Sequence, residues 1–205
     1  MSKTSELIKW TFDRSVSIFG LLALSPVLLT IFLAIKGADP SQSAFFRQLR
    51  IGQNARPFFI LKFRSMKKDS GGSYITLAGD QRLTRIGKFL KKYKLDELPQ
   101  LWNVAKGEMS FVGPRPDVPG YADLLEGNDR KILELKPGIT GPATLKYRNE
   151  MELLALQADP LEYNDNVIWP DKIRINKIYA DNHSFIGDLK IILQTFHILN
   201  SPKDF

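Results

Sequence analysis

The stretch "SVSIFGLLALSPVLLTIFLAI", residues 15–35, decides how the rest of the chain must be arranged. Its 21 residues carry no charge, and as a helix they would extend about 31 Å, close to the thickness of a hydrocarbon core. Pro26 in its middle removes one backbone hydrogen bond, and the Ser25 hydroxyl is placed to satisfy the freed carbonyl. The sequence therefore predicts a membrane helix within residues 1–37 that is broken at Ser25-Pro26.

The residues alone leave the topology of this helix open. Basic residues flank it on both sides, with Lys9 and Arg14 before it and Lys36 and Arg47 after it. Positive charge on both flanks favours two cytoplasmic ends, and so a re-entrant helix that returns to the face it entered. A single kinked span fits the same length. Because there is one apolar segment, a multi-span transporter is excluded, and its position argues against a cleaved signal peptide.

Composition narrows the chemistry of the remaining residues, 38–205, which we expect to form one domain. The formal net charge is +7, and residues 36–95 carry 14 Lys and Arg but 3 Asp and Glu. Such a basic stretch suggests an anionic partner: nucleic acid, phospholipid or a phosphorylated small molecule. The absence of cysteine excludes a thiol nucleophile and Cys-zinc sites, and two histidines are too few for a His-rich metal centre. Any mechanism must rest on carboxylates, amines and guanidiniums.

The sequence patterns predict a mostly helical α+β fold. Residues 44–66 read as a short β-hairpin around a turn with Gly52 and Asn54, and Lys62 and Arg64 share one face of its second strand. Residues 82–94 have the spacing of an amphipathic helix whose basic face suits phospholipid. The helix predicted over 184–199 is apolar nearly all round, so Asp188 within it needs a partner.

The stretch "LDELPQL", residues 95–101, places two carboxylates side by side. Asp96 is a plausible N-cap, Pro99 would lie in the first turn, and Gly107 would end a helix of about ten residues. The positive end of that helix would keep Asp96 and Glu97 ionised. An ionised Asp beside cations is able to attack phosphorus, and a neighbouring Glu is able to bind Mg²⁺. Simple helix capping explains the same residues, and the pattern alone does not separate the two interpretations.

Residues 95–116, "LDELPQLWNVAKGEMSFVGPRP", resemble the signature of the bacterial sugar transferase family, the monotopic phosphoglycosyl transferases. The similarity extends through Ser25-Pro26, "LKFRSM" (61–66), "KPGITG" (136–141), "YRN" (147–149) and "DLKIIL" (188–193), so it covers nearly the whole chain. The family usually has Trp-Ala-Gln after "ITG", and here the chain departs from that pattern with Pro142.

This resemblance implies roles for individual residues. Asp96 would be the nucleophile that takes up a phosphosugar from a UDP-sugar and releases UMP, and Glu97, with Asp96, would hold Mg²⁺. The family's functional lysine and late aspartate fall on Lys62 and Asp188. The sites expected to bind the substrate are Lys62, Arg64, Arg115, Arg148 and Asp188. The Ser25-Pro26 break matches the family's re-entrant helix, which decides the topology in its favour.

The resemblance also implies partners and a location. The acceptor would be undecaprenyl phosphate, and the chain would lie as a monotopic protein in phospholipid on the cytoplasmic face of a bacterial inner membrane. Nucleic acid is not expected as a partner, a homodimer is left open, and the sugar is not readable from the sequence. Two rival interpretations are a membrane-tethered nucleic-acid-binding module and a non-catalytic membrane scaffold. Neither gives a reason for a Pro-Arg-Pro loop beside an Asp-Glu pair.

Overall fold

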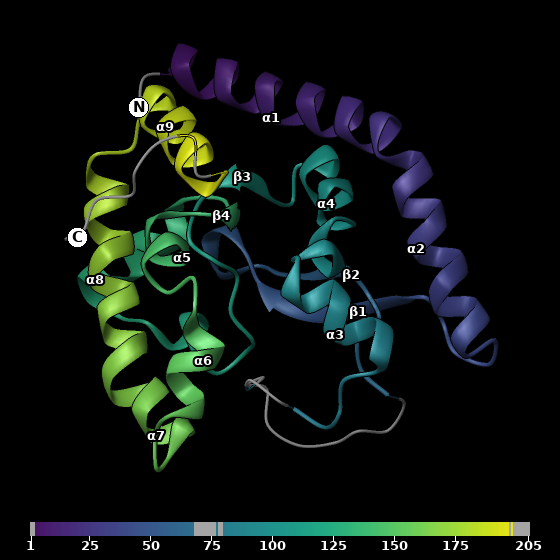
Figure 1. The fold of residues 1–205 in the computed structure, drawn as a ribbon. Helices are drawn as coiled ribbons and strands as arrows, with labels where there is room; N and C mark the ends of the chain where they lie inside the picture. The colour runs from purple at the N-terminus through teal and green to yellow at the C-terminus, as the bar shows by residue number, and fades with distance from the viewer. Residues whose placement is uncertain (1–2, 68–76, 78–79, 197, 199–205) are drawn as a thin grey trace.

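The computed structural model describes residues 3–67, 77, 80–196 and 198. The fold is mostly helical α+β (Figure 1), as predicted. The α-helices and β-strands in chain order are α1 Lys3–Ala23, α2 Ser25–Ala38, β1 Phe45–Ile51, β2 Pro57–Phe63, α3 Arg85–Lys92, α4 Gln100–Lys106, β3 Ser110–Val112, β4 Gly138–Thr140, α5 Pro142–Lys146, α6 Glu150–Ala155, α7 Pro160–Tyr163, α8 Trp169–Asp181 and α9 Phe185–Thr195.

The N-terminal helix breaks where the sequence predicts. Helices α1 and α2 meet at an angle of 60° between Ala23 and Ser25. The Ser25 hydroxyl donates a hydrogen bond of 2.7 Å to the carbonyl of Leu22, which is the group that Pro26 leaves without an amide donor. Within the described residues, neither helix alone is long and apolar enough to cross a bilayer, whereas the bent pair together has the required length and composition.

The predicted hairpin forms between β1 and β2, an antiparallel pair in which Arg47 lies opposite Leu61. Its outer face leaves Phe59 about half exposed, while its inner face buries Ile60 and Lys62. The Asn103 side chain of α4 accepts from the Leu61 amide at 3.0 Å and donates to the Phe59 carbonyl at 2.8 Å. Because these bonds imitate a neighbouring strand, α4 is fixed against the edge of β2 and the orientation of Lys62 is fixed with it.

A second, parallel pair joins β3 and β4 near the ends of α1 and α9 (Figure 1). The loop after β3 approaches the backbone before β4 so closely that a Cβ at Gly113 would lie 2.2 Å from the Lys136 carbonyl. Only glycine fits there. This contact positions the Pro-Arg-Pro loop that follows β3.

The acid pair does not begin the predicted ten-residue helix. Leu95–Glu97 form a single 3₁₀ turn, and α4 begins only at Gln100 with Pro99 as its N-cap residue. Lys94, in the left-handed backbone conformation (φ 54°), turns the chain before Leu95, and Pro99 has no amide that could bond to the Leu95 carbonyl, so the α-helix does not extend through the acid pair. Gly107 does end the helix in the left-handed conformation, as predicted.

Helix α1 is fastened to the rest of the molecule by a buried polar cluster. The ammonium of Lys9 lies 2.9 Å from Asp13, 3.1 Å from Asp188 and 2.7 Å from the Ser110 hydroxyl. Asp188 also accepts a 2.6 Å hydrogen bond from the Tyr179 hydroxyl. The partner that the sequence required for Asp188 is therefore in α1.

Candidate active-site cleft

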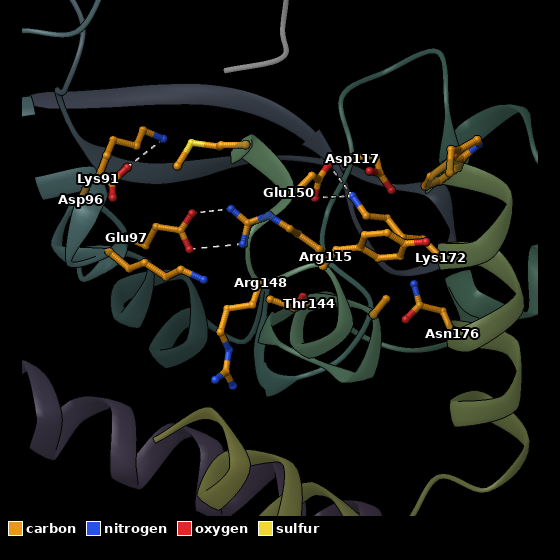
Figure 2. Close-up of a pocket in the computed structure, with 15 residues that line it drawn as sticks. Lys91, Asp96, Glu97, Arg115, Asp117, Thr144, Arg148, Glu150, Lys172 and Asn176 are labelled. Carbon is orange, nitrogen blue, oxygen red and sulfur yellow. Dashed lines mark hydrogen bonds and ion pairs between the residues drawn. The ribbon is translucent and has the colours of Figure 1, made fainter. Parts of the chain in front are cut away.

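The acid pair lies at one end of a cleft lined by the α3–α4 segment, the loop after β3, and helices α5, α6 and α8 (Figure 2). Asp96 is 2% exposed, and the ammonium of Lys91 lies 3.1 Å from its carboxylate. Glu97 receives two hydrogen bonds from the guanidinium of Arg115, one of them 3.2 Å long, and Lys62 lies 3.3 Å away. Each acid is thus paired with its own cations.

These pairs set the protonation of the cleft. Burial would raise the pKa of Glu97, but the charges of Arg115 and Lys62 outweigh burial and hold that pKa well below its usual range. Glu97 in turn raises the pKa of Arg115. Burial lowers the pKa of Lys62 to about 8, against the opposing attraction of Glu97. Glu97 is therefore a carboxylate at neutral pH, and Lys62 is a cation that titrates just above it.

The loop that carries Arg115 is rigid for reasons visible in the sequence. Prolines on both sides fix φ, and the backbone is tied to β1. The Arg50 guanidinium donates to the Pro116 carbonyl at 3.1 Å, and the Ile51 amide donates to the Asp117 carbonyl at 2.9 Å. The guanidinium of Arg115 is thereby held between the acid pair and the far end of the cleft.

The structure brings together most, but not all, of the predicted site residues. Asp96, Glu97, Arg115 and Arg148 line one cavity of about 150 Å³. Lys62 joins them through Glu97. The guanidinium of Arg148 also donates to the Gln194 carbonyl of α9 at 3.1 Å.

Two predicted substrate-binding residues lie elsewhere. Arg64 follows the last residue of β2, donates to the Ser43 carbonyl at 2.8 Å and stands over the Phe46 ring, so it does not line the cleft. Substrate binding by Arg64 stays a prediction, although Arg64 lines neither the cleft nor the adjoining cavity that Lys62 lines. Asp188 lies in the buried cluster with Lys9. The geometry supports a positioning role for Asp188 rather than contact with a substrate.

Sequence reasoning missed three charged residues of the cleft: Asp117, Glu150 and Lys172. The ammonium of Lys172 lies 2.7 Å from Glu150, and burial raises the pKa of Asp117 to about 6 although Lys172 and Arg50 oppose the shift. The position of Asp117, two residues after Arg115 in the rigid loop, was a usable signal. Glu150 and Lys172 come from helices whose sequences carry no motif, so folding alone reveals them.

The carboxylates of the cleft allow one mode of Mg²⁺ binding. Across the described residues, no group of three or more His, Asp or Glu side chains is able to hold a metal ion. The described residues therefore do not form a magnesium site from protein ligands alone. Adjacent carboxylates at Asp96 and Glu97 do fit the commoner mode, in which one or two carboxylates act together with substrate phosphates. For Glu97 to take part, Arg115 would move from the carboxylate to a phosphate.

Taken as chemistry, the cleft combines a buried carboxylate with convergent cations. Lys91, Lys62 and Arg115 are positioned to bind phosphoryl oxygens and to neutralise charge that develops during phosphoryl transfer. Comparison with known proteins agrees with this interpretation: a family model described as "Bacterial sugar transferase" matches residues 4–201. The chain belongs to the bacterial sugar transferase family.

Members of this transferase family with similar sequences differ in length. The sugar transferase EpsL of Bacillus subtilis (strain 168) is 36% identical over 191 residues, which are 92% of this chain and 85% of EpsL. UDP-glucose:undecaprenyl-phosphate glucose-1-phosphate transferase of Escherichia coli (strain K12) is 39% identical over 171 residues, 80% of this chain but 36% of that protein. Undecaprenyl-phosphate glucose phosphotransferase of Komagataeibacter xylinus is 42% identical over 154 residues, 71% of this chain and 29% of that protein. The chain therefore spans most of the short relative and about a third of the long ones.

Proposed function

We propose that this chain transfers a sugar-1-phosphate from a UDP-sugar to undecaprenyl phosphate or a related polyprenyl phosphate, and releases UMP. The observation that carries the proposal is the cleft in which Asp96 and Glu97 stand side by side, each paired with cations of the kind that bind phosphates. The relatives from E. coli and K. xylinus are named as undecaprenyl-phosphate sugar phosphotransferases, which supports the same reaction. The reaction would be the first membrane step in the synthesis of a polysaccharide or another glycoconjugate.

In the first half-reaction an oxygen of Asp96 attacks the sugar-bearing phosphorus of the donor. A bond forms between that oxygen and phosphorus, and the bond from phosphorus to the bridging oxygen breaks, so UMP leaves with the electron pair. Arg115 and Lys62 are placed to neutralise the phosphoryl oxygens as this charge moves. The product is a phosphosugar joined to Asp96 as an acyl phosphate.

In the second half-reaction a phosphate oxygen of the polyprenyl phosphate attacks the same phosphorus. The bond to Asp96 breaks and the carboxylate is restored, while the polyprenyl diphosphate sugar is released. No proton has to be removed from the acceptor, because a phosphate oxygen is already a nucleophile. This explains how the cleft works without a histidine or a thiol.

Mg²⁺ is part of the proposal. When bound by Glu97, with Asp96, and by the donor phosphates, it would supply positive charge at the diphosphate. Within the chain, Arg115 is the residue that would exchange its carboxylate partner for a phosphate oxygen, since it reaches Glu97 from the opposite wall of the cleft.

We further propose that residues 1–37 form a re-entrant membrane helix and that residues 38–205 form the catalytic domain at the cytoplasmic face of a bacterial inner membrane. The 60° bend, and the exposed apolar side chains of Phe19, Leu22, Leu29 and Leu33, suit insertion into one leaflet of phospholipid. A homodimer stays a prediction.

The test is UMP release by purified protein given Mg²⁺, polyprenyl phosphate and a panel of UDP-sugars. We expect release with at least one donor, and a loss of at least 10³-fold in Asp96→Asn, of the order seen when an essential catalytic group is removed. The panel also identifies the sugar. Release that is unchanged in a folded Asp96→Asn variant would exclude Asp96 as the nucleophile, and no release from any donor would favour the scaffold or nucleic-acid interpretations.

A further inference from the structure

A second chamber adjoins the cleft along the loop that carries Arg115 and Asp117. Its volume is about 240 Å³, and it shares the walls formed by Arg115, Asp117, Glu150 and Lys172. Its further lining includes Tyr121 and Asn164, while Trp169 lines both chambers. Neither the acid pair nor Arg148 lines this chamber, but Lys62, Lys91 and Arg115 do. The chamber therefore begins at the cations that are placed to bind the donor phosphates and continues to the rings of Tyr121 and Trp169, to which the first half-reaction gives no task at the phosphorus itself.

The direction of phosphoryl transfer fixes which part of the donor faces this chamber. Attacking and leaving oxygens lie roughly in line through phosphorus. Figure 2 shows Asp96 at one end of the cleft, Asp117 and Lys172 at the other, and Arg115 between them. With Asp96 as the attacking group and the phosphates at Arg115, the leaving UMP points toward Asp117 and Lys172. The sugar is attached through an oxygen outside that line, so it projects to the side.

The lining of the chamber has the chemistry that a nucleoside requires. The rings of Tyr121 and Trp169 meet edge to face with centroids 5.5 Å apart, and Trp169 packs on a buried cluster that holds it in place. The Tyr121 hydroxyl donates to Asp165 at 2.8 Å, which fixes that ring as well. A fixed aromatic surface of this kind stacks bases, and the Asn164 amide beside it is able to bond the polar edge of a pyrimidine.

Asp117 supplies what a ribose requires. Its carboxylate lies at the boundary of the two chambers, and among the described residues no side chain hydrogen-bonds to it. A carboxylate in such a place accepts hydrogen bonds from neutral hydroxyls and repels a phosphate, and an acid is the usual partner of ribose hydroxyls in nucleotide sites. The order along the cleft is therefore nucleophile, phosphate cations, ribose acceptor and aromatic wall.

We infer that this chamber binds the uridine half of the donor, with Asp117 accepting from the ribose hydroxyls and Trp169 stacking on the base. The inference rests on the proposed function for the identity of the donor. It makes the chamber, rather than the acid pair, the part of the molecule that selects uridine nucleotides. It also makes Asp117 and Trp169 binding residues that retain UMP after the first half-reaction.

The test compares the binding of three sugar-free probes, UMP, 2′,3′-dideoxy-UMP and ribose 5-phosphate, by calorimetry on the full chain in detergent. We expect the wild type to prefer UMP over each analogue by about tenfold, the effect of ~1.4 kcal/mol. Asp117→Ala should lose the preference over the dideoxy analogue alone, and Trp169→Leu should lose the preference over ribose 5-phosphate alone. Each result is a ratio of two dissociation constants measured on the same variant. Removing the negative charge of Asp117 changes the binding of every phosphate-bearing probe alike, so that effect cancels in the ratio. Asp181→Asn on the outer surface is the matched control and should keep both ratios.

Other results of this binding experiment would contradict the inference that the chamber binds uridine. Ratios that are unchanged in both variants, or a wild type that does not bind UMP, would overturn the inference. So would unchanged UMP binding with an altered preference among UDP-sugars, because the chamber would then hold the sugar. If Trp169→Leu fails to fold, Trp169→Phe, which keeps an aromatic face, and Asp117→Ala still give the result. UMP binding with the expected ratios, but without turnover of any UDP-sugar, would contradict the proposed function and leave the uridine chamber standing.

Discussion

Glu97 is the residue around which the charges of the cleft are arranged. It is buried between Arg115 and Lys62, so its carboxylate exchanges water for two cations. Removing one partner of a buried pair leaves the others uncompensated, which costs far more than the pair contributes at a surface. The same arrangement lets a donor diphosphate replace Glu97 as the partner of Arg115.

Glu97→Gln should therefore lower the free energy of unfolding by about 3 kcal/mol at pH 7, measured by urea denaturation. Because the folded-state pKa of Glu97 is depressed, its stabilisation is fully present above the unfolded pKa of about 4.3 and is lost as pH falls further. The difference between variant and wild type should shrink below about pH 4. Asp181→Asn, which removes an exposed partner of Lys131, should change stability little at either pH. Equal effects of the two substitutions would contradict a buried pair.

Lys62 should determine the pH above which the binding of the UDP-sugar donor weakens. Its pKa of about 8 means that the ammonium loses its proton as pH rises through that value, and with it the attraction to a diphosphate. The KM for the UDP-sugar should rise above pH 8 in the wild type. In Lys62→Arg the guanidinium stays charged, so the KM should stay flat to about pH 9.5. If the KM rises at the same pH in the wild type and in Lys62→Arg, the titrating group is not Lys62.

At the scale of elements, the break between α1 and α2 is the feature on which the proposed re-entrant topology depends. A proline at position 26 without a compensating hydroxyl would leave the Leu22 carbonyl unbonded, and Ser25 supplies that bond. The two residues thus make a stable bend rather than a weak point. A bend of 60° directs the second helix away from the axis of the first, so the pair is not a straight span, and the re-entrant topology that we propose fits this bend.

The bend gives a prediction about labelling. Because the chain has no cysteine, single cysteines at Thr4 and Ser41 report cleanly on each end of the helix pair. Both should react with a membrane-impermeant reagent from the cytoplasmic side alone. In Pro26→Leu, which restores an amide donor to Leu22 and favours a straight helix, a fraction of position 4 or 41 should become reachable from outside. Outside labelling of one end in the protein without this substitution would mean a spanning helix.

Elements with a strong local signal were predicted, and those shaped by distant contacts were not. The hairpin, the broken helix and the helix end at Gly107 follow from turn residues, Ser25-Pro26 and a glycine C-cap. The 3₁₀ turn at the acid pair depends on the left-handed Lys94, which no residue pattern shows. Asp96, Glu97 and Arg115 were found because they share one short motif. Glu150 and Lys172 lie 22 residues apart along the chain, on two different helices, and only the packing of these helices brings the two side chains together.

At the scale of the whole molecule, α1 is connected to the rest of the protein through the cluster of Lys9, Asp13, Ser110 and Asp188. Figure 1 shows α1 lying across the end of the molecule that holds β3 and α9. The Lys9–Asp188 pair is almost fully buried, so it ties α1 to α9 at one fixed position. The depth of the cleft relative to a lipid surface would depend on this contact.

Asp188→Asn should accordingly destabilise the protein without changing donor affinity. We expect a loss of about 3 kcal/mol, because Lys9 keeps its charge with one partner fewer. The dissociation constant of UMP should stay within twofold of the wild type, since Asp188 does not line the cleft. Urea denaturation and calorimetry measure the two quantities on the same sample. A large fall in UMP affinity in the folded variant would place Asp188 among the substrate-binding residues after all.

The most direct test of the central claim is the intact mass of the protein after incubation with the UDP-sugar identified by the panel, without acceptor. The wild type should gain the mass of one phosphosugar on the peptide that contains Asp96 and should release one equivalent of UMP. It should lose the added mass when polyprenyl phosphate is added. Asp96→Asn should gain no such mass. UMP release that requires the acceptor from the start, with no adduct, would contradict a covalent intermediate, and an adduct on another residue would contradict Asp96 as the nucleophile.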